Sequence, residues 1–154
     1  MDLTKPGVAL TDVILGLFRV NSLLLMRGDR LVADLGLTSA RWQVLGAIVY
    51  ADRPEPVAWL ARDLGSNRQN VQRIVNDLHR EGFVEFQTNP HHRRAQLVVL
   101  TDKGRAAFDR AMQLWIPWAN SLAEGHSLKD IGTMAAFVNA LRRKLEDGHN
   151  ADDE

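Results

Sequence analysis

The chain has 154 residues with 45% apolar content, 19 basic and 19 acidic residues, and no cysteine. That length fits one compact domain or one domain with an oligomerisation element, and the lack of cysteine excludes disulfides, thiol redox sensing and thiolate metal sites. No basic region precedes an apolar run at the N-terminus, and no uninterrupted apolar stretch approaches the roughly 20 residues of a membrane span. These observations predict a cytoplasmic protein with no membrane partner.

A long helix is predicted from about Leu10 to Leu35, where Gly36 supplies a stop. Its apolar residues recur at spacings of three, four and seven, as in one face of a helix. They are Ile14, Leu17, Leu24, Leu31 and Leu35. A helix of this length exceeds what a small domain needs to cover its core, so part of it is expected to pack against another subunit.

Two further helices are predicted before residue 66. The first covers residues 38–51 with Thr38 or Ser39 as its N-cap, and the prolines in residues 53–56 interrupt the pattern. Pro56 suits the first position of a helix that ends near Leu64, and a short strand over residues 55–57 is also expected. The Gly65 turn then joins this helix to the next one, which makes a helix-turn-helix.

The helix from about Asn67 to Glu81 has two unlike faces. Ser66 and Gln69 match the Ser-x-x-Gln capping box, and Gly82 suits the left-handed turn that follows. One stripe is apolar and is expected to face the core, and the opposite stripe is polar. The apolar stripe is Val71, Ile74, Val75 and Leu78, and the polar one is Gln69, Gln72, Arg73, Asn76 and Arg80.

The polar face carries the side-chain types that read base edges in the major groove of DNA. Arg68 and Asn70 add to it, and the first acid of the helix is Asp77, so a negative groove meets no repulsion before that point. A solvated surface helix is the alternative interpretation, because Gln and Arg are ordinary helix formers. The segment that follows favours the first interpretation.

A β-hairpin with a basic loop is predicted next. Residues 83–88 and 96–101 are rich in β-branched and aromatic residues, and residues 89–95 between them begin with turn formers. Four consecutive loop residues, His91 to Arg94, are His or Arg and suit phosphates or a narrow minor groove. Exposed basic loops are also common without such a role.

Two helices are predicted after the hairpin. The first begins at Thr101 or Asp102 and contains Pro117, which should kink it. The second is capped by Ser127 with Asp130 and ends before Gly148, and residues 149–154 are expected to form a disordered acidic tail.

The predicted fold is mainly α with a small β-hairpin wing. Residues 37–101 form a winged helix-turn-helix DNA-binding domain, and residues 1–36 and 102–148 form a helical dimerisation region whose apolar residues exceed what one small module needs. A symmetric dimer would place two copies of the polar-faced helix about one DNA turn apart.

Three stretches together resemble the MarR family of bacterial transcriptional regulators. They are LGLTSARWQVL (35–45), LARDLGSNRQNVQRIVNDLHREGFV (60–84) and NPHHRRAQLVVLTDKG (89–104). The resemblance implies a homodimer that binds a pseudo-palindromic double-stranded DNA operator, usually as a repressor. The residues expected to contact DNA are Ser66, Asn67, Arg68, Gln69, Asn70, Gln72, Arg73, Asn76, His92, Arg93 and Arg94.

The sequence departs from the family pattern in the wing. The family often has Asp-Pro-x-Asp-Arg-Arg there, and Asn89 and His92 replace both acids. Because those acids steady the wing arginines, their replacement leaves the orientation of Arg93 and Arg94 open. The resemblance also implies a small aromatic effector, bound in a cleft between the dimerisation helices and the DNA-binding domain. Arg41 and Trp42 are the candidate residues for that cleft.

Other function classes find less support. No Gly-rich phosphate loop, His-Glu-x-x-His motif or nucleophile beside a base indicates an enzyme, and no cofactor is implied. His91 and His92 could ligate a metal, but adjacent loop histidines point apart more often and no second cluster accompanies them, so no metal site is predicted. A winged helix used only for protein–protein contacts commonly loses its basic wing, and this chain keeps Arg93 and Arg94.

Overall fold

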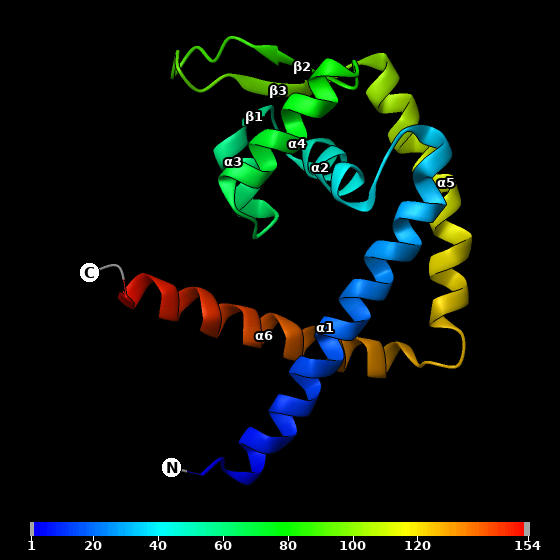
Figure 1. The fold of residues 1–154 in the computed structure, drawn as a ribbon, viewed down its shortest axis with the longest axis vertical. Coiled ribbons are helices and arrows are strands. Elements are labelled where there is room, and N and C mark those ends of the chain that lie inside the picture. The colour runs from blue at the N-terminus through cyan, green and yellow to red at the C-terminus, as the bar shows by residue number, and fades with distance from the viewer. Residues whose placement is uncertain (1, 153–154) are drawn as a thin grey trace. The chain divides into compact units, whose positions relative to one another are not determined.

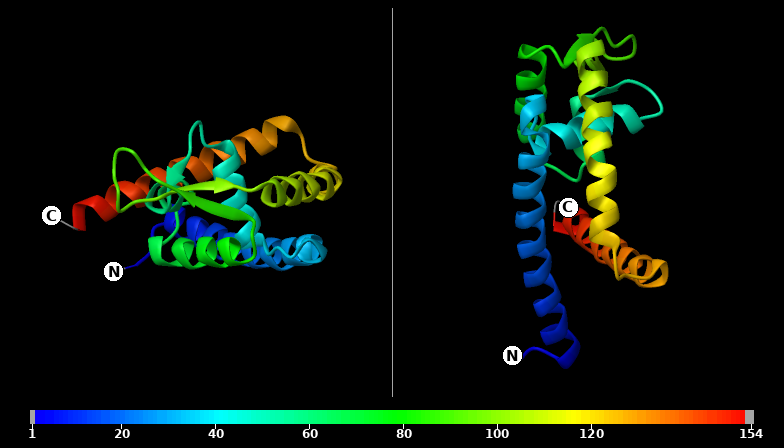
Figure 2. Two further views of the ribbon diagram at one scale, coloured as in Figure 1. Left: turned by 90° about the horizontal axis from the view of Figure 1, so that it is seen from above. Right: turned by 90° about the vertical axis from the view of Figure 1, so that its right-hand side faces the viewer.

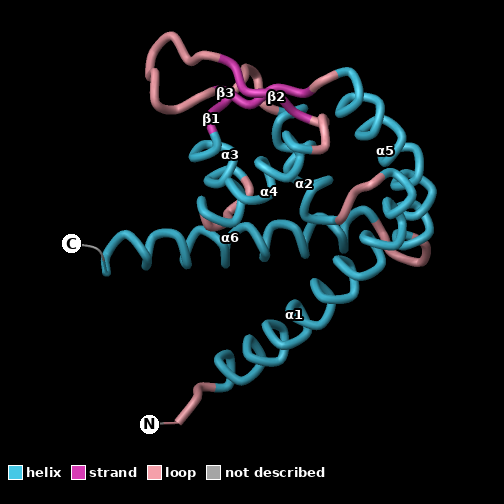
Figure 3. The backbone as a smooth tube through the Cα atoms, turned by 45° about the horizontal axis from the view of Figure 1, so that its top comes forward, coloured by secondary structure: helices cyan, strands magenta, loops and turns pink. Residues whose placement is uncertain are grey.

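The computed structural model describes residues 2–152, which form helices and one small sheet (Figures 1 and 3). The elements in chain order are α1 (Lys5–Val32), the 3-10 helix η1 (Ala33–Leu35), α2 (Ser39–Tyr50), β1 (Glu55–Pro56), α3 (Val57–Asp63), α4 (Arg68–Arg80), β2 (Val84–Gln87), β3 (Leu97–Leu100), α5 (Asp102–Ala123) and α6 (Leu128–Asp152). The chain divides into two compact units, Met1–Ile116 and Pro117–Glu154. The predicted mainly helical fold with a wing is therefore confirmed. The division into a DNA-binding domain and a dimerisation region stays a prediction.

The sheet has the antiparallel order β1-β3-β2. Val84 pairs with Leu100 and Gln87 with Leu97, so β2 and β3 form the expected hairpin. Glu55 pairs with Val98, which confirms the short third strand. The sequence predicts Pro56 as the first residue of the helix. In the structure Pro56 belongs to β1 and is the N-cap of α3, so the helix begins one residue later, at Val57. Figure 3 shows the long loop that connects β2 to β3.

The core of the first unit lies where α2, α3 and α4 pack beneath the sheet (Figure 1). Its largest fully buried side chains come from these elements and from the end of α1. They are Leu45, Leu60, Leu78, Val32, Val44, Val71, Val75, Val84 and Val98. The apolar side of α4 is thus held by helices and sheet together, which fixes the direction in which its polar side faces.

The end of the hairpin and the start of α5 approach each other closely. Thr101 donates its backbone N–H to the Phe83 carbonyl at 3.1 Å, and its hydroxyl donates to the Gly82 carbonyl at 2.6 Å. The same hydroxyl accepts from the Gly104 N–H at 3.1 Å and so caps α5. A Cβ at Gly104 would overlap the Phe83 carbonyl oxygen, so only glycine fits there.

Helix α1 is longer than the sequence pattern predicts. It starts at Lys5 rather than near Leu10, because Thr4 caps it by accepting a 3.2 Å hydrogen bond from the Gly7 N–H. Its C-terminal part is tied to α2, since Ser39 donates its N–H to Asp29 and its hydroxyl to the Leu25 carbonyl. The remainder continues away from α2–α4 as one rod (Figure 2, right).

The surface of α1 is unusually apolar for an exposed helix. Phe18 is 65% exposed and Leu23 56% exposed. By length and composition alone the segment Lys5–Leu35 could cross a membrane. Charged residues such as Asp12, Arg19 and Arg27 interrupt it, so it is not the uninterrupted apolar run that the sequence analysis looked for. Monomeric proteins rarely expose so large an apolar area.

In the second unit, α6 begins as predicted. The Ser127 hydroxyl accepts from the Asp130 N–H at 3.1 Å and donates to its carboxylate at 2.6 Å. The helix does not end before Gly148 but continues to Asp152, so the predicted disordered tail is wrong for residues 149–152, while residues 153–154 lie outside the described part. Pro117 lies inside α5, and the kink expected there stays a prediction.

Candidate nucleic-acid interface

The start of α4 is fixed by Asn67 rather than by Ser66. The Asn67 side-chain oxygen accepts hydrogen bonds from the N–H groups of Gln69 at 2.8 Å and Asn70 at 3.3 Å. The predicted Ser66–Gln69 capping box is therefore wrong. Ser66 instead donates its own N–H to the Ala61 carbonyl at 2.9 Å, which closes the turn after α3 and leaves the cap to the next residue.

The prediction that α4 has one apolar and one polar face is confirmed. The four predicted apolar residues are all buried, whereas Gln72 is half-buried and the remaining members of the polar stripe are exposed. A polar hollow of about 640 Å³ runs along this side of the helix. Its lining residues are Arg68, Gln69, Gln72, Arg73, Asn76, Asp77 and Arg80.

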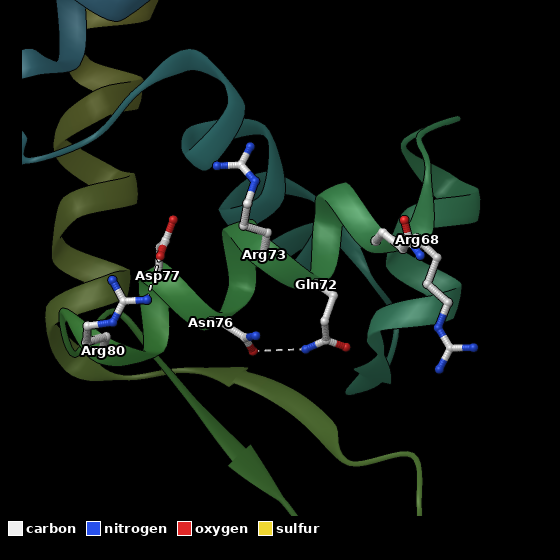
Figure 4. A pocket seen from close by; sticks show the side chains of 7 residues that line it. Arg68, Gln72, Arg73, Asn76, Asp77 and Arg80 are labelled. Carbon is white, nitrogen blue, oxygen red and sulfur yellow. Dashed lines mark hydrogen bonds and ion pairs between the residues drawn. The ribbon is translucent and has the colours of Figure 1, made fainter.

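Hydrogen bonds hold several side chains of this polar face in place (Figure 4). Gln72 donates to the Asn76 side-chain oxygen at 3.0 Å, and both project from the same side of the helix. Arg80 pairs with Asp77 at 2.8 Å, which offsets the one acid on the face. Preordered amide and guanidinium groups lose less side-chain entropy when a polar partner binds.

Asn70 supports Arg73 in the same way, accepting a hydrogen bond from its guanidinium at 3.0 Å. Arg73 leaves α4 on the side opposite to Gln72 and Asn76 in Figure 4. The polar face therefore presents two separate groups of donors, one centred on Arg73 and one on the Gln72–Asn76 pair.

The wing loop is organised by the buried side chain of Asn89. Its amide donates to the Ala95 carbonyl at 2.9 Å, and its oxygen accepts from the His91 N–H at 3.0 Å. Two backbone hydrogen bonds, from His92 to Asn89 and from Ala95 to His92, close the loop further. Asn89 can make both hydrogen bonds because an amide donates and accepts, whereas a carboxylate only accepts.

A groove of about 210 Å³ connects α4 to the wing. Arg68, Gln72 and Asn76 line it from the helix, and Phe86 and Arg94 line it from the hairpin. Residues from the two sequence-predicted parts of the interface, the helix and the wing, are therefore brought together.

The other predicted wing residues lie outside this groove. His92 and Arg93 are exposed on the loop, and His92 lines a separate cavity on the wing. Ser66 and Asn67 stand at the start of α4, where their backbone and side chain close the turn and cap the helix. Within the described residues, Arg68, Arg93 and Arg94 make no ion pair, so their charges remain available to an anionic partner.

The two candidate effector residues make contacts within the protein. The Arg41 guanidinium donates to the Glu81 carboxylate at 2.8 and 2.9 Å and to the Gly36 carbonyl at 3.1 Å. Trp42 packs against the core and meets Trp115 edge to face, with ring centroids 5.6 Å apart. Arg41 therefore joins α2 to the end of α4. The two residues are 40 positions apart in the chain, and no sequence pattern indicates that they meet.

Sequence reasoning also missed a cluster around Trp59 on α3. The guanidinium carbons of Arg53 and Arg62 lie 5.4 and 5.3 Å from its ring centroid. The signal was present, because Trp59 does not belong to the apolar edge of the helix formed by Val57, Leu60 and Ala61. A large aromatic residue opposite a core-facing edge indicates a surface contact.

Glu55 in β1 is electrostatically strained. Burial, and then the nearby negative charge of Asp63, raise the pKa of the Glu55 carboxyl above its ordinary value of 4.5, against smaller lowering effects of Arg62 and Arg53. Within the described residues, Glu55 Oε2 is buried without a hydrogen-bond partner. Burial and the neighbouring carboxylate thus make the charged form of Glu55 less favourable than that of a carboxyl in water.

A helix-turn-helix with a polar outward second helix, followed by a hairpin with a basic loop, defines a winged helix-turn-helix DNA-binding protein. The MarR family profile matches residues 35–95. The chain belongs to the MarR family of transcription regulators, whose members are not enzymes, and it is a DNA-binding regulator.

Two similar proteins show how far the likeness extends in sequence. The uncharacterized protein Rv2011c of Mycobacterium tuberculosis is 36% identical over 133 residues, which cover 86% of this chain and 90% of that protein. The transcriptional activatory protein BadR of Rhodopseudomonas palustris is 34% identical over 98 residues, which cover 60% of this chain and 54% of BadR.

Solved structures share the fold. Sco5413, a MarR family transcriptional regulator from Streptomyces coelicolor, superimposes with a TM-score of 0.77 at 25% identity, covering 92% of this chain and 98% of that one. The M. tuberculosis regulator MosR in complex with DNA gives 0.67 at 24%, covering 84% and 97%. CouR from Rhodococcus jostii bound to p-coumaroyl-CoA gives 0.75 at 21%, covering 84% and 91%.

Proposed function

We propose that this protein is a homodimer that reads a pseudo-palindromic operator in double-stranded DNA and represses transcription until a small ligand binds. The observation that carries the proposal is the groove shared by α4 and the wing, in which Arg68, Gln72 and Asn76 face the same space as Arg94. In this proposal the α4 side chains contact base edges in the major groove, and the wing arginines contact the adjacent backbone or minor groove.

The solved relatives support both parts of the proposal. MosR was solved in complex with DNA and CouR with p-coumaroyl-CoA bound. Because BadR is a transcriptional activatory protein, the sign of regulation needs its own test. A reporter placed behind the operator should rise when the gene for this chain is deleted, and a fall would identify an activator.

Exposed apolar side chains on two helices support the homodimer. On α1 they include Val13, Phe18, Val20, Leu23 and Leu24, and on α6 they include Ile131, Met134, Phe137, Val138 and Leu145. Obligate dimers bury roughly 2,000 Å² or more of largely apolar surface, which helices of 28 and 25 residues can supply. The proposed location is the cytoplasm, because Arg19 in the middle of the α1 segment would be costly in a bilayer.

Light scattering of the purified protein tests the dimer. The expected mass is twice 17.3 kDa, and Phe18→Glu should shift the protein toward monomer, whereas Arg19→Glu on the neighbouring position changes charge without removing an apolar contact. A monomeric wild type would contradict the proposal, because half-site spacing would then have no physical origin.

DNA binding is tested in two steps. Duplexes retained from a random pool identify the operator, and fluorescence anisotropy then measures affinity against salt. Arg94→Ala should weaken binding to every duplex and lower the slope of log K against log salt by about 1, whereas Gln72→Ala should change sequence preference more than overall affinity. Arg110→Ala, an exposed arginine on α5, is the matched control. Equal losses for Arg94→Ala and Arg110→Ala would exclude a specific wing contact.

A further inference from the structure

Gln72 and Asn76 act as one unit on the polar face of α4 and are named here the amide pair. The Gln72 Nε2 donates a hydrogen bond to the Asn76 Oδ1 at 3.0 Å, and both side chains leave the helix on the same side (Figure 4). Each amide has a carbonyl oxygen and an NH2 group. The bond between them therefore leaves the Gln72 oxygen as an acceptor and the Asn76 NH2 group as a donor.

Adenine is the base whose major-groove edge matches one donor beside one acceptor. It presents N7 as an acceptor and its N6 amino group as a donor, whereas guanine presents two acceptors and cytosine one donor. The Asn76 NH2 group can donate to N7 while the Gln72 oxygen accepts from N6. If the two amides exchange roles, the pair still keeps one donor and one acceptor, so the match to adenine is the same.

Phe86 adds an apolar surface beside the amide pair. It lines the same groove of about 210 Å³ as Gln72 and Asn76, and its side chain is half-buried. His79 of α4 holds the ring in place, with the two ring centroids 4.9 Å apart, and its Nδ1 lies 3.1 Å from the Val84 carbonyl oxygen. A phenylalanine in a DNA-reading surface suits the C5 methyl group of thymine, the partner of adenine.

We propose that this groove selects one A·T base pair in each half-site of the operator, with the amide pair on adenine and Phe86 against the methyl group of thymine. Arg68 and Arg94 line the same groove and are available to phosphates, which hold the duplex but carry no sequence information. This base preference rests on the proposed function, because α4 must enter the major groove for the contacts to form.

Selection from a random duplex pool locates the base pair. Asn76→Asp keeps the shape of the side chain and the acceptor for Gln72, but it leaves the pair with acceptors only. The preference for A·T should therefore disappear at one position of each half-site. Arg73→Ala is the matched control, because Arg73 leaves α4 on the other side (Figure 4). It should lower overall affinity and keep the A·T preference at that position.

Base analogues at that position test each contact in the unmodified protein. Replacement of adenine by 7-deazaadenine removes N7, and replacement of thymine by uracil removes only the methyl group. Fluorescence anisotropy should show affinity lowered about tenfold by the first change and about threefold by the second. Asn76→Asp should be insensitive to 7-deazaadenine, and Phe86→Ala should be insensitive to uracil.

Thermal melting shows whether each variant is folded; should Phe86→Ala fail to fold, the response of the wild type to uracil still decides the role of Phe86. A G·C pair at the position altered by Asn76→Asp, or a wild type indifferent to both analogues, would overturn the inference while leaving sequence-specific DNA binding intact. A loss with 7-deazaadenine alone would support the amide pair and exclude Phe86. If the wild type retains no duplex at all, the proposed function fails and the base preference with it.

Discussion

Arg41 and Glu81 form a forked ion pair, with two N–H···O hydrogen bonds of 2.8 and 2.9 Å. Arg41 lies in the first turn of α2, and Glu81 caps the C-terminal end of α4. The Glu81 carbonyl also accepts a 2.6 Å hydrogen bond from Lys103 in α5. Glu81 therefore connects the end of the proposed reading helix to two other helices.

The fork predicts a measurable coupling between its two residues. Arg41→Ala and Glu81→Ala should each lower the free energy of unfolding by about 1 kcal/mol or less, because the pair is partly exposed and its attraction is screened. Urea unfolding of both single variants and the double variant measures the coupling. The double variant should lose less than the sum of the single ones; strict additivity would mean that the fork contributes nothing.

The cap of α4 gives a second prediction. Asn67→Ala should destabilise the protein by about 1 kcal/mol, because the N–H groups of Gln69 and Asn70 would lose their acceptor. Ser66→Ala, one position earlier, is the matched control and should be close to neutral, since Ser66 uses only its backbone in the turn. The reverse order of melting temperatures would restore the capping box with Ser66.

The wing loop gives a third prediction. Asn89→Asp keeps the acceptor for the His91 N–H but loses the donor to the Ala95 carbonyl, so it should weaken the loop by about 1 kcal/mol and reduce affinity for the operator. Gln43→Glu, at an exposed position on α2, introduces the same charge away from the wing as a control. Equal affinities of the two variants would show that charge alone is responsible.

A fourth prediction concerns pH. Because the pKa of Glu55 is raised in the folded state, the folded protein holds that proton more tightly than the unfolded chain, and the charge of Glu55 lowers stability as pH rises above its ordinary value of 4.5. Glu55→Gln resembles the protonated form. It should therefore raise the melting temperature at pH 7, and the difference from the wild type should shrink as pH falls toward 4.5.

The matched variant for this prediction is Glu85→Gln, which makes the same substitution at an exposed glutamate of the same sheet, on β2. Melting temperatures of the wild type and both variants between pH 4 and 8 decide the question. A gain for Glu55→Gln that is the same at every pH would attribute the effect to packing rather than to the proton.

The sequence predicts those parts of the fold that depend on local periodicity. The buried stripe of α4 and the pairing of β2 with β3 follow from spacings of 3.6 and 2 residues and are confirmed. The N-cap of α4 was misplaced by one residue because Ser66 and Asn67 are both good caps, and the choice between them depends on the tertiary turn that engages the Ser66 N–H.

Parts of the site that depend on long-range contacts could not be predicted. The Arg41–Glu81 fork joins residues far apart in the chain, and no local pattern marks it. At Asn89 the sequence comparison indicated a lost charge, whereas the burial of the side chain and its donor role toward Ala95 are visible only in the folded loop. The meeting of Arg94 with Arg68 in one groove likewise depends on how the hairpin lies against α4.

The close approach of Gly104 to the Phe83 carbonyl leaves no room for a side chain between the hairpin and the first turn of α5. With Thr101 bonded to both Gly82 and Phe83, this junction has no slack to absorb motion. Because of these contacts, a rotation of the first turn of α5 is expected to move the start of the hairpin with it. The orientation of the wing therefore depends on α5 as well as on α4.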